Sequence, residues 1–292
     1  MATTTAQGFS QLATNLNITG LQTSTVSTRQ QNVRDAVADE LTVLESFLAG
    51  SYRRSTMIAP LYTADVDVFI VLDGSYYLRY SGQANGQANL LDLVKRTLRK
   101  TYRNTPDISR NGQAVTIQFT DFQVDVVPAF YRQGGGFLIA DSISKAWIST
   151  DPKKHVELSS AANTAHSGDL VPLIKMIKGW NVENGHFFRS FHLEVLVQQI
   201  LNNVRISNYP SGVRYFFEHG IEVVAQRNLD PAGYGDDVGR YITSTMVPEA
   251  KSRFTTAYNR AQRAEQAARE EKMASAYEAW KLVFGKYFPS YG

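Results

Sequence analysis

The sequence predicts an α+β fold in two lobes, with a mixed sheet and helices in the first half and helices alone in the second. Strand-like segments rich in Val, Ile and Phe stop near residue 150, whereas segments after about residue 155 have the periodicity of helices. Two aspartates also lie two residues apart in an otherwise apolar strand. We therefore place one lobe at residues 1–150 and a helical lobe at residues 151–292, with a ligand cleft between them.

The first lobe begins with a polar segment and continues into a long helix. Apolar residues recur at helical spacing at Val33, Val37, Leu41, Leu44 and Leu48. We therefore expect one helix over residues 27–49, ended by a glycine at residue 50. A strand over 66–72, a helix over 90–102 and a hairpin over 114–130 follow. The basic face at 95–103 is interpreted as a solvated helix face, because interleaved aromatics that would stack on nucleic-acid bases are missing apart from Tyr102.

The second lobe is expected to consist of helices. The apolar patterns at residues 170–181, 191–204 and 212–226 each predict one helix. A single long helix is expected from Pro248 to about Tyr287, since proline is favoured in the first helical turn. We interpret this helix as a structural brace, and docking of a protein partner is the alternative.

Composition limits the classes of protein to which the chain can belong. It has 292 residues, 43% of them hydrophobic, a net charge of +3 and no cysteine. Disulfide frameworks and thiolate metal sites are therefore excluded. The first 18 residues lack the basic and apolar regions of a secretory signal. No window reaches the ~20 apolar residues that span a bilayer, so we expect a cytoplasmic protein without membrane contact.

Three carboxylates are the strongest candidates for a functional site. Asp65 and Asp67 project from the same face of one strand, because residues two apart in a strand share a face. Asp125 lies in a second strand, FQVDVVP, and joins them if the two strands are neighbours. Such carboxylates repel one another unless a cation lies between them, and Mg²⁺ is typically held by carboxylates and substrate phosphates. Taken singly, the aspartates are better explained as a strand-edge cap (Asp65), a surface residue (Asp67) and a hairpin charge (Asp125), and only their combination favours a site.

Gly50 and Ser51 precede the strand that carries the aspartates. Glycine allows the backbone to approach a ligand closely, and a serine hydroxyl and amide can hold a terminal phosphate. We therefore expect a phosphate-binding turn followed by a metal-binding strand. The alternative for Ser51 is a turn that ends the long helix.

These residues resemble a known family. Gly50-Ser51, a spacer, Asp65-Val66-Asp67-Val68 and the later Asp125 resemble the signature of the DNA polymerase β-like nucleotidyltransferases. The string GSYRRSTMIAPL with DVDVFIVL resembles the bacterial cGAS/DncV-like enzymes, which are oligonucleotide cyclases of anti-phage signalling. The resemblance implies a polymerase β-like core with a mixed sheet, joined to a helical domain of the oligoadenylate synthase type. LDPAGYGDD, residues 229–237, is similar to a late motif of the bacterial cyclases.

The resemblance also implies roles for individual residues. Asp65, Asp67 and Asp125 match ligands of two Mg²⁺ ions, with Mn²⁺ as a substitute, and Asp125 also activates the attacking hydroxyl. Gly50 and Ser51 match the residues at the triphosphate. Three more substrate-binding residues are implied in the helical lobe, namely Lys175, Lys178 and Ser190.

The helical-lobe residues have structural alternatives. The two lysines also suit a solvated helix face, and Ser190 suits an N-cap. His192 and Glu194 are interpreted as a buried hydrogen-bonded pair rather than metal ligands. Asp236 and Asp237 suit a nucleobase contact and a Gly-rich turn equally well, and Arg54 and Thr56 are interpreted as organising their loop.

The predicted function is therefore an Mg²⁺-dependent cyclase that makes a cyclic oligonucleotide from ATP and other ribonucleoside triphosphates. A template-independent polymerase with a linear product is the alternative, although net charge +3 gives little support to an RNA-binding surface. A nucleotide sensor without turnover is a further alternative, which intact carboxylates disfavour. The resemblance also implies a downstream effector that binds the product and a regulatory protein partner; a nucleic-acid activator is left open.

Overall fold

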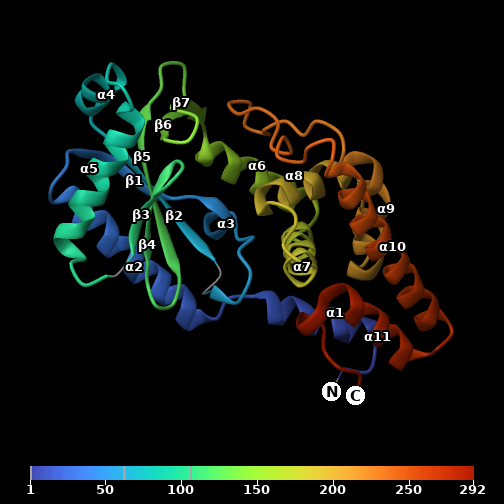
Figure 1. The fold of residues 1–292 in the computed structure, drawn as a ribbon. Coiled ribbons are helices and arrows are strands. Elements are labelled where there is room, and N and C mark those ends of the chain that lie inside the picture. Colours follow the sequence, from blue (N-terminus) through green and yellow to red (C-terminus); the bar gives the residue numbers. More distant parts are fainter. Residues whose placement is uncertain (1, 62–63, 106) are drawn as a thin grey trace. The chain divides into compact units, whose positions relative to one another are not determined.

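The computed structural model describes residues 2–61, 64–105 and 107–292, and the chain divides into two compact units (Figure 1). One unit is the uninterrupted segment 18–157, which we call the sheet unit. The other joins residues 1–17 to residues 158–292, and we call it the helical unit. Within the described residues, no helix has both the length and the apolar composition needed to cross a membrane.

The sheet unit is organised around one mixed sheet. Its strands are β1 (Val43–Leu48), β2 (Asp65–Leu72), β3 (Ile108–Asn111), β4 (Ala114–Gln118), β5 (Gln123–Tyr131), β6 (Phe137–Asp141) and β7 (Ala146–Thr150). The order is β1-β2-β5-β4-β3, and β6 pairs with both β5 and β7. β2 and β5 run parallel, while the other pairs are antiparallel. The predicted strand at 66–72 and the predicted hairpin at 114–130 are both confirmed.

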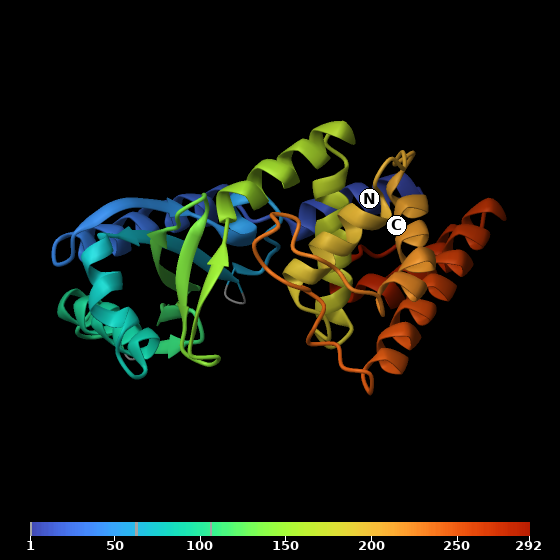
Figure 2. The same cartoon turned by 90° about the horizontal axis from the view of Figure 1, so that it is seen from above.

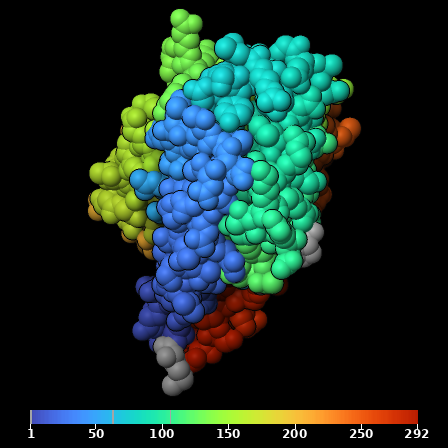
Figure 3. All heavy atoms as spheres, turned by 90° about the vertical axis from the view of Figure 1, so that its left-hand side faces the viewer, coloured from blue at the N-terminus to red at the C-terminus, as the bar shows by residue number. Residues whose placement is uncertain are grey.

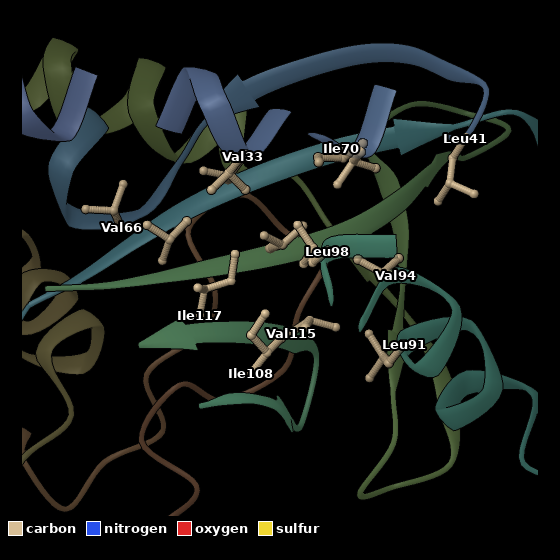
Figure 4. Packing of buried hydrophobic residues seen from close by; sticks show 14 of the residues in the cluster. Val33, Leu41, Val66, Ile70, Leu91, Val94, Leu98, Ile108, Val115 and Ile117 are labelled. Atoms are coloured by element: carbon tan, nitrogen blue, oxygen red, sulfur yellow. The ribbon is translucent and has the colours of Figure 1, made fainter. Parts of the chain in front are cut away.

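Helices α2 (Gly20–Ala38) and α5 (Gly86–Thr101) lie side by side on this unit (Figure 3). They cover one face of the sheet, where Val33, Val94 and Leu98 pack towards strand residues such as Ile70 and Ile117 (Figure 4). Helix α4 (Gly74–Ser81) and the short α3 (Gly50–Arg53) complete the unit. The opposite face carries a smaller apolar cluster around Phe69, Val127 and Phe137. Polar side chains on that second face therefore lie beside a cluster of buried apolar side chains.

The helical unit contains α1 (Thr5–Leu16), α7 (Leu170–Glu183), α8 (Ser190–Ile200), α9 (Tyr209–Val223), α10 (Val247–Arg269), α11 (Met273–Phe284) and the 3₁₀ turn η2 (Gly285–Tyr287). Helix α6 (Pro152–Ala165) contains the boundary between the units. α10 runs beside α9 and α11 (Figure 2). The core is aromatic, and the Trp180 ring meets those of Phe217 and Phe254 at centroid distances of 4.8 and 5.5 Å.

The predicted helix over residues 27–49 is wrong in its second half. α2 begins earlier, at Gly20, and ends at Ala38, whereas residues 43–48 form β1. The physical reason is pairing, since β1 binds β2 along an antiparallel register from Val43↔Leu72 to Leu48↔Val68. A helical spacing of leucines therefore coincides here with a strand, because tertiary pairing overrides a short local pattern.

The N-terminal segment packs with the helical unit, not with the catalytic half in which the sequence places it. Phe9 and Leu12 of α1 are buried, and the Phe9 ring meets that of Trp280 at 4.8 Å. The carbonyl of Thr4 accepts a 2.6 Å hydrogen bond from the Tyr277 hydroxyl. The structural boundary also lies after residue 157, inside α6, instead of after residue 150.

The predicted single helix from Pro248 to Tyr287 is also corrected, because it is two helices. α10 ends at Arg269 and α11 starts at Met273. Glu271 between them has φ of 61°, a left-handed conformation that no continuous helix contains. α11 then folds back on α10, so the small side chains of Ala257 and Ala264 become buried.

Candidate active site

Gly50 is held against the carboxylate of Asp67. The backbone leaves β1, and the N–H of Ala49 donates a 2.9 Å hydrogen bond to the carbonyl of Asp67. At Gly50, φ is 61°, and a Cβ atom there would lie only 1.7 Å from Asp67 Oδ2. Both the conformation and the contact require glycine. The close approach that the sequence predicts is therefore made to the protein's own carboxylate.

Ser51 is fixed by the loop that follows it. Its carbonyl accepts hydrogen bonds from the N–H groups of Thr56 and Met57 at 2.9 and 3.1 Å, and from Thr56 Oγ1 at 3.4 Å. Thr56 and Met57 are both buried. The interpretation that Thr56 organises the loop is confirmed. The alternative that Ser51 ends a long helix is wrong, because α2 stops at Ala38 and Ser51 belongs to α3.

The three carboxylates share one face of the sheet. β2 and β5 are adjacent and parallel, with Asp67 opposite Asp125 and Asp65 opposite Gln123. Val66 and Val68 alternate with the aspartates and pack into the core on the helix-covered face. The aspartates therefore project from the opposite face, which also carries the second apolar cluster. The expectation that the two strands are neighbours is confirmed.

The environments of the carboxylates differ. Asp65 is exposed and accepts a hydrogen bond from Gln123 Nε2. Asp125 is half-buried and accepts a 2.5 Å hydrogen bond from Thr116 Oγ1. Burial raises the pKa of Asp125, the Thr116 bond opposes that rise, and the negative charge of Asp65 adds to it. Asp125 therefore holds a proton more readily than an ordinary aspartate does.

Thr116 and Gln123 are site residues that the sequence analysis missed. Thr116 lies on β4 directly opposite Asp125, and Gln123 lies opposite Asp65. Each side chain donates to a carboxylate. A threonine between Val115 and Ile117 looks like any strand residue in the sequence. Only the register between β4 and β5 reveals its role.

The carboxylates provide the oxygen ligands that Mg²⁺ prefers. Burial is the main cause of the raised pKa of Asp125, and the negative charge of Asp65 adds a repulsion that a cation would relieve. Within residues 2–61, 64–105 and 107–292, however, no three His, Asp or Glu side chains are already gathered as a metal cluster. The donor chemistry therefore fits a divalent cation, while the ligand set stays a prediction.

The two predicted lysines of α7 lie in different environments. Lys178 is only 5% exposed, and its Nζ donates a 3.1 Å hydrogen bond to Glu194, which is fully buried. Lys175 is half-buried and donates a 2.8 Å hydrogen bond to Asn17 Oδ1. Burial lowers the pKa of Lys175, and the charge of Lys178 lowers it further. A solvated face is therefore wrong for Lys178, and contact with phosphates stays a prediction for both.

Ser190 is the first residue of α8 and not its N-cap, which is Arg189. The N-cap alternative is therefore wrong, and its role at the triphosphate stays a prediction. His192 is 1% exposed, as the sequence analysis expects of a buried histidine, although Glu194 is bonded to Lys178. Burial lowers the pKa of His192 to about 4.

The segment at residues 229–237 is an ordered turn. Asp237 Oδ1 accepts hydrogen bonds from the N–H groups of Asn228 and Gly239 at 2.9 and 2.8 Å. Asp236 accepts one from Arg227. These bonds favour the turn interpretation of both aspartates, and a nucleobase contact stays a prediction.

Comparison with models of protein families identifies the family to which this chain belongs. The model of the Second Messenger Oligonucleotide or Dinucleotide Synthetase (SMODS) domain matches residues 1–163, which is more than half of the chain. The chain belongs to the SMODS family. The SMODS match includes Gly50, Ser51 and all three carboxylates, and the resemblance to bacterial cGAS/DncV-like nucleotidyltransferases is confirmed.

Two relatives extend the similarity beyond the SMODS domain. A cyclic AMP-AMP-AMP synthase of an Acinetobacter strain is 28% identical, over 98% of this chain and 86% of that protein. A probable cyclic nucleotide synthase of Bacillus cereus is 26% identical, over 83% of this chain and 81% of that protein. The similarity therefore includes most of the helical unit.

Solved structures share the fold. CdnC of E. coli MS115-1, solved with ATP, has a TM-score of 0.79 at 20% identity and covers 98% of this chain and 99% of its own. DncV of Vibrio cholerae has a TM-score of 0.70 at 13% identity and covers 84% of this chain and 70% of its own. The polymerase β-like α+β fold is therefore confirmed. This SMODS protein is a nucleotidyltransferase that makes a cyclic oligonucleotide, and a linear product is not favoured.

Proposed function

We propose that this SMODS protein converts ATP into a cyclic trinucleotide of AMP. The Acinetobacter relative, aligned over 98% of this chain, is a cyclic AMP-AMP-AMP synthase, and so is an E. coli relative that is 27% identical over 59% of the chain. In each step, a ribose hydroxyl oxygen forms a bond to the α-phosphorus of ATP, and the bond from that phosphorus to pyrophosphate breaks. Three such steps, the last of them within one molecule, close the ring.

The observation that carries the proposal is the register of Asp67 opposite Asp125 on parallel strands, with Gly50 packed against Asp67. A base that accepts the hydroxyl proton works best when its pKa is not far below the working pH. Burial raises the pKa of Asp125, so this carboxylate suits that role. Ser51, whose carbonyl accepts hydrogen bonds from the N–H groups of Thr56 and Met57, would bind the triphosphate.

The three aspartates would hold Mg²⁺, as two ions, with Mn²⁺ as a substitute. When bound, these cations neutralise the charge of the phosphates and of the departing pyrophosphate. The residues themselves orient the reaction, because Gln123 and Thr116 restrict the carboxylates of Asp65 and Asp125. Contact of Lys175, Lys178 and Ser190 with the nucleotide phosphates is part of the proposal.

We extend the proposal to the biological setting. CdnC of E. coli MS115-1, which shares the fold with a TM-score of 0.78, has been solved in complex with a HORMA protein. A regulatory partner of that kind, an effector that binds the cyclic product, a role in antiviral defence and a cytoplasmic location all follow by similarity. A pull-down of this protein with HORMA proteins encoded beside its gene tests the partner.

The test of the activity is direct. The purified protein is incubated with ATP and Mg²⁺ or Mn²⁺, treated with phosphatase and analysed by mass spectrometry. We expect a phosphatase-resistant product with the mass of three AMP units, and none from the Asp65→Asn/Asp67→Asn variant. Incubation with all four ribonucleoside triphosphates then shows whether other bases enter the ring. A ladder of phosphatase-sensitive chains would contradict the proposal.

A further inference from the structure

Two hydrogen bonds to one tyrosine link the exposed N-cap of helix α8 to a buried histidine in its first turn. The backbone N–H of Arg189, the N-cap residue, donates a 2.8 Å hydrogen bond to the hydroxyl of Tyr241. That hydroxyl lies 2.9 Å from Nδ1 of His192, the third residue of the helix. Burial raises the pKa of Tyr241 to about 12 and lowers that of His192 to about 4, so the hydroxyl and the imidazole are both uncharged at neutral pH.

This pair of hydrogen bonds replaces an ordinary capping box. In a capping box, a Glu or Gln at the third helical position binds the N–H of the N-cap residue directly. Here the third position is His192, and the Tyr241 hydroxyl from a distant segment completes the connection. The Arg189 side chain makes no capping hydrogen bond, and its guanidinium instead lies 4.7 Å from the centre of the Tyr241 ring. Tyr241 therefore holds Arg189 through both its backbone and its side chain.

The segment that carries Tyr241 is held by internal hydrogen bonds and packs against His192. Asp230 Oδ2 accepts hydrogen bonds from the N–H groups of Tyr234 and Gly235, at 3.2 and 2.7 Å. A Cβ atom on Gly239 would lie 3.0 Å from Nε2 of His192, so the backbone is in close contact with the imidazole. The segment therefore contacts the first turn of α8 both through the Tyr241 hydroxyl and through the backbone at Gly239.

We propose that Tyr241 and His192 are positioning residues that fix Ser190, the first residue of α8, for binding of the ATP triphosphate. This inference rests on the proposed function, which assigns the triphosphate contact to Ser190. It also gives the segment at residues 229–241 a role. The segment packs against the N-terminal end of α8, and its aspartates accept hydrogen bonds that stabilise the turn.

The test compares binding of a non-hydrolysable ATP analogue and of AMP by calorimetry, with Mg²⁺ present, in the full-length protein. Tyr241→Phe removes only the hydroxyl. We expect it to weaken binding of the ATP analogue about tenfold, as the loss of one hydrogen bond and its geometry predicts, and to leave AMP binding unchanged. Tyr209→Phe is the matched control, because the Tyr209 hydroxyl donates a 2.9 Å hydrogen bond to Asp169, the N-cap of α7.

A double-mutant cycle makes the test specific to Ser190. If Tyr241 acts through Ser190, the Tyr241→Phe effect disappears in a Ser190→Ala background, because coupled residues are not additive. His192→Asn, which keeps a hydrogen-bond acceptor near Nδ1, should bind the ATP analogue more tightly than His192→Leu does.

Other outcomes separate the two proposals. Equal weakening of ATP-analogue and AMP binding by Tyr241→Phe, or an effect that persists without Ser190, would overturn the positioning role alone. An unmutated protein that does not bind the ATP analogue would overturn the proposed function and the positioning role with it.

Discussion

The backbone at Gly50 and the carboxylate of Asp67 occupy adjoining space, with only 1.7 Å between Asp67 Oδ2 and the place where a Cβ atom of residue 50 would lie. Sixteen residues separate Gly50 from Asp67 in the sequence, so the fold itself brings the two together. The glycine therefore makes room for the carboxylate of Asp67.

 

Replacing Gly50 with alanine should therefore disable the site without unfolding the protein. The new methyl group forces either the backbone or the Asp67 carboxylate to move, and a misplaced catalytic group costs roughly 100-fold in rate. We expect cyclic product to fall by that factor while the melting temperature changes by only a few degrees. Gly74→Ala is the matched control, since nothing lies within 4 Å of a Cβ atom there. Equal activity of the two variants would contradict this account.

Thr116 should matter to catalysis through its hydroxyl alone. Valine has the same shape but cannot donate to Asp125 Oδ1. We expect Thr116→Val to lower kcat/KM about tenfold, because a hydrogen bond to a charged group is lost. Thr116→Ser, which keeps the hydroxyl, should retain most of the activity. The idea fails if both variants behave alike in steady-state assays of product formation.

Loss of the ion pair between Lys178 and Glu194 should lower the free energy of unfolding. Both side chains are buried, so Glu194→Gln leaves an ammonium group without its counter-charge. We expect the free energy of unfolding to fall by about 3–5 kcal/mol. The measurement is urea denaturation, with Glu157→Gln as the control at the exposed Lys154–Glu157 pair.

The double variant Lys178→Met/Glu194→Leu separates stability from substrate binding. It removes both buried charges, so most of the lost stability should return. If Lys178 also binds phosphate, ATP binding should stay weak in this stable variant. Full recovery of ATP affinity would limit Lys178 to a structural role.

Acid should destabilise the protein through His192. Burial lowers its pKa from 6.5 to about 4, and the nearby charge of Asp237 opposes that change. Between these two values the unfolded chain binds a proton that the folded chain does not, so stability falls as pH falls. From pH 6.5 to 4 this histidine should remove about 3 kcal/mol, and above pH 6.5 it should have no effect. Urea titrations at several pH values, with His192→Asn as the comparison, check the slope.

The catalytic strand and the hairpin could be predicted because their signals are local. Val66 and Val68 alternate with Asp65 and Asp67, and this alternation specifies a strand whatever surrounds it. The same reasoning failed at β1, where the leucines also fit a helix. Pairing with β2 decides between the two structures, and pairing cannot be inferred from the local pattern.

Prediction of the candidate site from the sequence meets the same limit. The carboxylates and Gly50 belong to one recognisable motif, whereas Thr116 and Gln123 enter the site only through strand register. Lys178 also lies on the expected helix, but its burial with Glu194 depends on the packing of α7 against α8. Contacts between distant segments are thus the part that the sequence leaves undetermined.

The division of the chain has a consequence for its synthesis. The sheet unit is one continuous stretch, so it is complete as soon as residue 157 leaves the ribosome. Helix α1 is synthesised long before Trp280, which covers Phe9. We therefore expect the sheet unit to fold during translation, while Phe9 stays uncovered by Trp280 until residue 280 has been made. In that interval, the nascent chain exposes the apolar face of α1 to chaperones.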